Sequence, residues 1–139
     1  MFHTILNPVL ALIVWSLLMW ILMYLRRIPA MQKANIKPQE AAHPGSLESL
    51  PSSARAAADN YNHLHEQPTI FYALCFYLHL ANGADTPAIY LAWGYVILRV
   101  LHSLIQITAN IVMMRFIVFS LSSIVLIVMS VRALLGLGA

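Results

Sequence analysis

The chain has 139 residues, of which 60% are hydrophobic and only 9% are charged, whereas soluble domains average about 25% charged residues. Its mean hydropathy of +0.75 excludes a disordered chain, a coiled coil and most soluble globular folds. The formal net charge of +3 comes from dispersed residues, several of them inside apolar runs, and this excludes a nucleic-acid partner. These values predict a small all-α, multi-pass membrane protein whose single domain covers residues 1–139.

The first predicted membrane span covers residues 5–25. Its 21 positions would form a helix of about 31 Å, which matches a hydrocarbon core of about 30 Å. Arg26 and Arg27 end this span. The polar, proline-rich stretch 28–54 that follows is typical of a solvent-exposed loop.

The second predicted span covers residues 56–81 and has an unusual composition. Its outer half, from Thr69 to Ala81, is apolar but too short to cross a membrane, and its inner half is polar. We therefore expect one long helix with a polar half and an apolar half. Pro68 should interrupt or kink this helix because proline lacks a backbone N–H and clashes with the preceding turn.

Two further spans, 88–108 and 111–135, complete a predicted four-helix bundle. A single helix over this length would measure about 72 Å, so a break is expected near Ala109 and Asn110. Positive charges flank the loop 28–54, and the turn at 82–87 has none. The positive-inside rule therefore places that loop on the cytoplasmic side and both termini on the opposite side.

Two of the predicted helices each have a line of polar side chains at helical spacing. The lines are Arg55, Asp59, Asn62 and Glu66 on the second span, and Arg99, His102 and Gln106 on the third. An ionisable group inside a membrane span costs about 2.5–3.5 kcal/mol on insertion scales. Such groups normally face the bundle interior, pair with one another or bind a ligand.

We expect these two lines, with Arg115 at the start of the fourth span, to surround a polar cavity open to the cytoplasm. An excess of Arg suits an anionic or zwitterionic small molecule, because the guanidinium stays charged and matches a carboxylate. A simpler alternative is a buried Glu66–Arg99 ion pair that only fixes helix register. His63 and His65 are two positions apart and point in nearly opposite directions on a helix, so no metal site is predicted.

Two segments of the chain resemble a known family, the membrane-associated proteins in eicosanoid and glutathione metabolism (MAPEG). The segment 62–72, which reads NHLHEQPTIFY, is similar to the family's Asn…Glu…Pro…Phe segment on the second helix. Arg99 and His102 form an R-x-x-H motif like that of the family, and Arg115 follows at the start of the fourth span. The resemblance covers most of the chain, with four spans and a long polar first loop.

The resemblance implies a MAPEG-like homotrimer that binds glutathione, as a co-substrate, in a cleft between neighbouring subunits. Asn62, Glu66, Arg99 and His102 match positions of that site. Arg115 is similar to the Arg that lies near the sulfur and favours the thiolate, and it is the predicted catalytic residue. Two further residues, Arg55 and Gln106, belong to the same polar lines and complete the predicted binding set.

The function implied is a glutathione-dependent membrane enzyme of the transferase or peroxidase type. It would conjugate glutathione to apolar electrophiles or reduce lipid hydroperoxides, with substrates entering from the bilayer lipids. Gln106 stands where the family often has Tyr, and the Asn-to-Glu spacing is four where many members have three. These departures leave open a non-catalytic binder or an accessory subunit of a membrane complex, and also a small proton-coupled transporter. The similarity to bacterial-type members implies a bacterial inner membrane.

Overall fold

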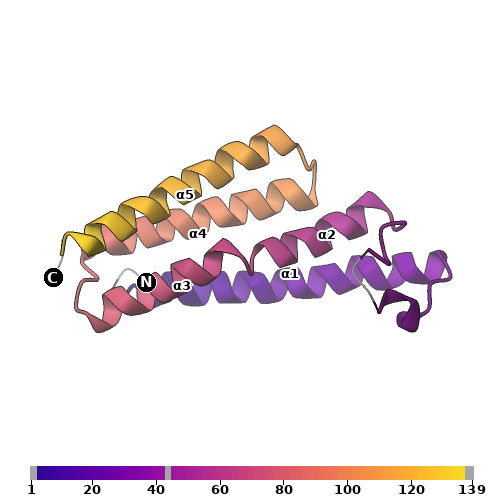
Figure 1. Ribbon diagram of the computed structural model, residues 1–139, viewed down its shortest axis with the longest axis horizontal. Helices are drawn as coiled ribbons and strands as arrows, with labels where there is room; N and C mark the ends of the chain where they lie inside the picture. Colours follow the sequence, from indigo (N-terminus) through magenta and orange to yellow (C-terminus); the bar gives the residue numbers. More distant parts are fainter. Residues whose placement is uncertain (1–2, 43–44, 137–139) are drawn as a thin grey trace.

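The computed structural model describes residues 3–42 and 45–136, which form an elongated bundle of helices (Figure 1). The elements in chain order are α1 (Leu6–Lys33), the short 3₁₀ helix η1 (Pro38–Ala41), α2 (Ser52–His63), α3 (Gln67–Leu80), α4 (Thr86–Ile107) and α5 (Val112–Leu134). Helices α2 and α3 follow one another along α1, and α4 and α5 form an antiparallel pair beside them (Figure 1). The predicted all-α bundle is confirmed.

Three helices, α1, α4 and α5, are each long and apolar enough to cross a membrane. Helices α2 and α3 have 12 and 14 residues, and each is therefore shorter than the roughly 20 residues that a crossing needs. Together they run back along α1 and return the chain to the end where α1 begins (Figure 1). The second crossing is thus made of two helices in series.

The interruption between α2 and α3 lies at residues 64–66, just before Pro68, which occupies the first turn of α3. Proline favours this position because its missing N–H would be unpaired there in any case. The carbonyl of Glu66 accepts hydrogen bonds from the backbone N–H of Thr69 at 3.3 Å and from its hydroxyl at 2.7 Å. The predicted effect of Pro68 on this helix is therefore confirmed.

Helix α1 is longer than the apolar run that it contains. It continues past Arg26 and Arg27 to Lys33, through the exposed Pro29, so the first part of the predicted loop 28–54 is helical. Arg26 provides the physical reason: its Nη1 donates to the carbonyls of Ser53, at 3.3 Å, and Ile107, at 2.9 Å. This contact holds the polar end of α1 against α2 and α4.

The connection between α4 and α5 lies where the length argument predicts it. Helix α4 ends at Ile107, and Asn110 adopts a φ of +52°, a left-handed conformation that asparagine tolerates better than most residues. At the other end of α4, the carboxylate of Asp85 accepts from the backbone N–H of Ala88 at 3.0 Å. The same carboxylate pairs with Arg132 of α5 at 2.6 Å, which joins the two helices there.

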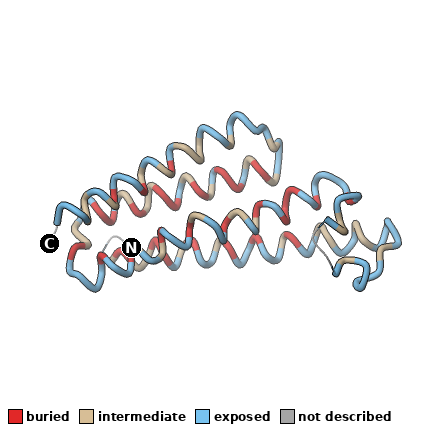
Figure 2. Tube along the Cα trace, viewed as in Figure 1, coloured by how far each residue is buried: buried red, intermediate tan, exposed pale blue. Residues whose placement is uncertain are grey.

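Buried residues lie mainly on the faces by which α1, α2, α3 and α4 pack together, and α5 is largely exposed (Figure 2). Phe71 of α3 stacks on Tyr95 of α4 with ring centroids 4.4 Å apart, and both rings are fully buried. Large apolar side chains on the outer faces of α1 and α5 are exposed, for example Leu17 and Ile127. Exposed apolar faces of this kind suit contact with lipid.

Candidate functional site

A line of polar side chains is buried between α2 and α4. Arg99, His102, Ser103 and Gln106 of α4 are each at most 4% exposed, and Asn60 of α2 is 1% exposed. Neither amide atom of Asn60 has a hydrogen-bond partner among the residues that the structure describes. Burying this many polar groups in a membrane bundle is costly, and two cavities lie next to them.

Arg99 lies at the centre of this line and is completely buried. Its Nη2 donates to Nδ1 of His63 at 2.7 Å and to the backbone carbonyl of His63 at 3.3 Å. The guanidinium carbon lies 5.6 Å from the ring centroid of Phe119 on α5, within the range of a cation–π interaction. The other two guanidinium nitrogens have no partner in the described part of the chain.

A small cavity of about 180 Å³ lies beside this arginine, between the end of α2, α4 and the first turns of α5. Its wall consists of His63, His102, Val112, Arg115, Phe116 and Phe119. The two imidazole rings lie 4.6 Å apart, centroid to centroid. Small-molecule sites usually measure about 300–1,000 Å³, so this cavity can hold one end of a ligand.

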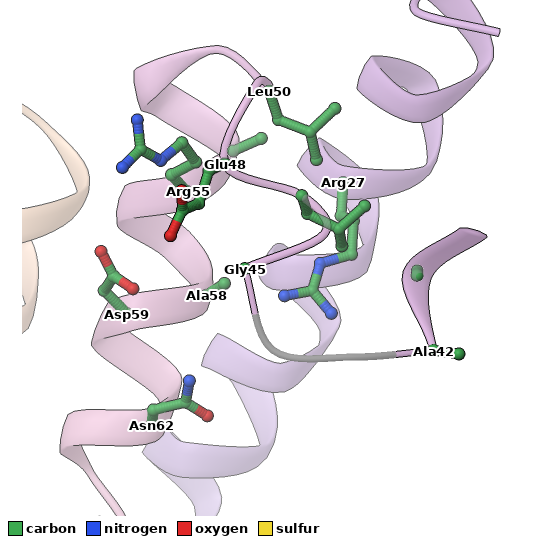
Figure 3. Close-up of a pocket in the computed structure, with 12 residues that line it drawn as sticks. Arg27, Ala42, Gly45, Glu48, Leu50, Arg55, Ala58, Asp59 and Asn62 are labelled. Carbon is green, nitrogen blue, oxygen red and sulfur yellow. The ribbon is translucent and has the colours of Figure 1, made fainter. Parts of the chain in front are cut away.

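A larger, polar cavity of about 490 Å³ lies between α1, the segment that precedes α2, and α2 itself. Figure 3 shows Arg27 reaching from α1 toward α2, where Arg55, Asp59 and Asn62 follow one another along the helix. The segment 45–50 closes the other side, with Gly45 at its start (Figure 3). This cavity has the size and the cationic groups that a charged peptide-like ligand requires.

The structure divides the predicted site residues among four environments. Arg55 and Asn62 line the larger cavity, and His102 and Arg115 line the smaller one. Arg99 and Gln106 are buried behind these surfaces. Glu66, in the link between α2 and α3, is exposed.

The two predicted polar lines do not meet within one chain. Helix α2 turns a different face toward α4, the one that contains Asn60 and His63, and Asn62 is left exposed, as is Glu66 in the link that follows. The alternative of a Glu66–Arg99 ion pair is not formed, because the described partner of Arg99 is His63. In the ranges 3–42 and 45–136, the salt bridge found is the one between Asp85 and Arg132.

Sequence reasoning missed several residues of this region. From the sequence alone, His63 is excluded as a metal ligand and Arg27 marks only the end of the first span. One signal was available: Asn60 and His63 lie three positions apart and so share a helix face that could oppose Arg99. For Phe119 no local pattern distinguishes it from the other apolar residues of its span.

Gln67 is a further missed residue, and it connects α3, α4 and α5. Its Oε1 accepts from the hydroxyl of Tyr95 at 3.1 Å, and its Nε2 donates to the hydroxyl of Ser123 at 2.9 Å. Ser123 in turn donates to the carbonyl of Phe119 at 2.9 Å. This chain of hydrogen bonds fixes α5, and with it the cavity wall, relative to α3 and α4.

Comparison with known proteins identifies the family of this chain. The MAPEG family model matches residues 5–135, which is nearly the whole chain. No curated protein and no solved structure matches the chain significantly. With three helices long and apolar enough to cross a membrane and a family model that spans all of the helices, this is an integral, multi-pass membrane protein that belongs to the MAPEG family.

Proposed function

We propose that this protein is a glutathione-dependent membrane enzyme that transfers glutathione to apolar electrophiles or reduces lipid hydroperoxides. The observation that carries the proposal is the pair of cavities toward one end of the bundle, one polar and rich in Arg and the other lined by Arg115 and two imidazoles. In a member of the MAPEG family, these features suit a charged tripeptide with a reactive thiol.

The larger cavity suits the peptide part of glutathione. Arg27 and Arg55 can each donate to a carboxylate, and Asp59 can accept from an ammonium group. Asn62 offers both a donor and an acceptor to peptide groups. Charged groups of both signs on one wall match a ligand that is itself zwitterionic.

The smaller cavity suits the thiol. A free thiol ionises with a pKa of about 8.5, and a fixed cation beside it favours the thiolate. Arg115 provides that cation, and its Nε has no partner in the described ranges. In the transferase reaction the thiol loses its proton to water. The thiolate then forms a carbon–sulfur bond as the electrophile releases its leaving group with the bonding electrons.

A site shared between subunits would bring the two cavities together. Asn62 and His63 are neighbours on α2, so their side chains point about 100° apart, and one ligand cannot easily reach both from a single chain. The exposed polar surface formed by Asn62 of α2 and Glu66 of the link that follows also requires cover within a membrane. We therefore propose a homotrimer in which the neighbouring subunit covers this surface. Glutathione would bind between the two subunits, and Glu66, Arg99 and Gln106 would lie beside it or behind it.

The apolar substrate would reach this site from the bilayer. Val112 and Phe116 line the smaller cavity and are at least 63% exposed, so its rim is continuous with the lipid-facing surface of α5. We expect this end of the bundle on the cytoplasmic side, because the cations around the larger cavity favour that side under the positive-inside rule. The chain ends then lie on the opposite side, and a bacterial inner membrane remains the expected location.

A glutathione titration of the purified protein in detergent tests the proposal. We expect saturable heat of binding, a rise in thiolate ultraviolet absorbance, and turnover of an apolar electrophile. Arg55→Ala should weaken binding, whereas Arg115→Met should keep binding and lose the thiolate signal. Lys37→Met, which changes an exposed cation outside both cavities, is the matched control.

The outcomes separate the remaining alternatives. No saturable binding by the wild-type protein at millimolar glutathione would refute the proposal. Binding without thiolate or turnover would favour the non-catalytic binder, an alternative that gains support from Gln106, whose buried side chain does not line the small cavity. Undiminished turnover in Arg115→Met would remove the role assigned to that residue.

A further inference from the structure

The hydrogen bond between Arg99 and His63 determines where the proton of one imidazole lies. A guanidinium can only donate hydrogen bonds, and its Nη2 lies 2.7 Å from Nδ1 of His63. Nδ1 must therefore accept with its lone pair. The ring of His63 is consequently neutral, and its single N–H is at Nε2.

Because Arg99 occupies the Nδ1 edge of the ring, it is the Nε2 edge that can face the small cavity. His63 lines the cavity, whereas Arg99, which occupies the Nδ1 edge, does not. The charged or titratable groups that face His63 are Arg99 and His102 from α4, Arg115 from α5, and Glu66 from its own segment. The hydrogen bond from Arg99 therefore leaves the Nε2–H of this ring available to donate.

We propose that His63 is a catalytic hydrogen-bond donor, whose Nε2–H binds the sulfur of the thiolate that Arg115 stabilises in the small cavity. Arg99 is the positioning residue: it selects the tautomer and holds the ring through both Nδ1 and the backbone carbonyl. Where the helix is interrupted after His63, that carbonyl accepts from the backbone N–H of Glu66 at 3.3 Å, and its second lone pair accepts from Arg99 at 3.3 Å.

The proposal deepens the proposed function and rests on it. Two groups of different kinds then stabilise the thiolate sulfur: Arg115 provides a positive charge, and His63 provides a directional hydrogen bond. His102 packs against the ring of His63 and forms the opposite wall. Hydrogen bonds to a charged acceptor contribute enough that losing one should change an equilibrium about tenfold to a hundredfold.

Nitrogen NMR of protein labelled at its six histidines tests the tautomer without any ligand. The signals lost in His63→Gln identify His63, and we expect a protonated Nε2 and an unprotonated Nδ1. In Arg99→Met the same ring should lose this preference. A proton on Nδ1 of His63 in the wild-type protein would overturn the inference whatever the protein binds.

Thiolate absorbance of bound glutathione at neutral pH tests the donation itself. His63→Phe keeps an aromatic ring but removes the donor, so the thiolate fraction should fall about tenfold or more while the heat of glutathione binding persists. His63→Gln places an amide N–H near the position of Nε2 and should restore part of the signal. The control is His65→Phe, because His65 is exposed, bonds the carbonyl of Tyr61 and lines neither cavity.

The results distinguish this inference from the proposed function. If the wild-type protein forms thiolate and His63→Phe forms as much, the inference is refuted and the proposed function stands. If the wild-type protein binds no glutathione, both are refuted. A thiolate signal that falls in His63→Phe and returns in part in His63→Gln supports both, since a purely structural role for the ring would not be rescued by an amide.

Discussion

The hydrogen bond from Tyr95 to Gln67 gives the sharpest prediction about how the bundle is held together. Tyr95→Phe keeps the stack on Phe71 and removes only the hydroxyl that donates to Oε1 of Gln67. Interhelical hydrogen bonds in membrane proteins contribute about 0.6 kcal/mol on average and up to about 1.7. At 3.1 Å this bond is longer than the usual O–H···O distance of about 2.7–2.8 Å, so we expect a loss of about 0.5–1 kcal/mol.

The second arm of the test is Gln67→Leu, alone and together with Tyr95→Phe. Gln67→Leu removes the bonds to both Tyr95 and Ser123 and should cost about 1–2 kcal/mol. It also leaves the buried hydroxyl of Tyr95 without its acceptor. Adding Tyr95→Phe in this background removes that orphaned group, so it should be neutral or stabilising.

The assay is the free energy of unfolding from a detergent titration followed by circular dichroism, at one protein concentration for all variants because an oligomer's stability depends on it. Tyr77→Phe, in a ring that is 57% exposed, is the control and should change stability by less than about 0.5 kcal/mol. An equal cost for Tyr95→Phe in both backgrounds would refute the coupling and, with it, the role of Gln67 as the connection among α3, α4 and α5.

Three further predictions follow from other contacts. Asp85→Asn should keep the cap of α4 and lose the salt bridge to Arg132, in which both side chains are about a quarter exposed. The stability should therefore fall by at most about 1 kcal/mol. A larger loss in a melting curve would contradict this. Arg26→Met leaves the carbonyl of Ile107 unpaired and should cost about 1–3 kcal/mol, which the same detergent titration measures. Cys75 is fully buried, so maleimide labelling followed by mass spectrometry should be negligible in the folded protein and complete after unfolding; rapid labelling of the folded protein would be inconsistent with the packing of α3.

The sequence predicts the helices well because their signals are local. An apolar run of fixed length, a proline and a change in charge are sufficient to define each span, and Pro68 and Asn110 lie where the chain breaks. The continuation of α1 beyond Arg26 could not be predicted in this way. It depends on carbonyls of Ser53 and Ile107, which are far away in the sequence.

The site was harder to predict because α2 is polar on two faces. Spacing groups Arg55 with Asn62 and Glu66, and it equally groups Asn60 with His63; nothing in the pattern states which group faces α4. In the structure the face with Asn60 and His63 is turned toward α4, where Arg99 donates to both Nδ1 and the carbonyl of His63.

The two polar faces of α2 have different purposes in the proposed enzyme. The inner face, with Asn60 and His63, builds a rigid wall against Arg99 and orients a neutral donor toward the small cavity. The outer face, with Asn62 exposed and Glu66 exposed in the link that follows, stays available to a ligand and to a neighbouring subunit. A short helix with two polar faces would be unstable alone in a membrane. It is tolerated here because one side is satisfied by α4, and the other would be satisfied by glutathione and the next copy of the chain.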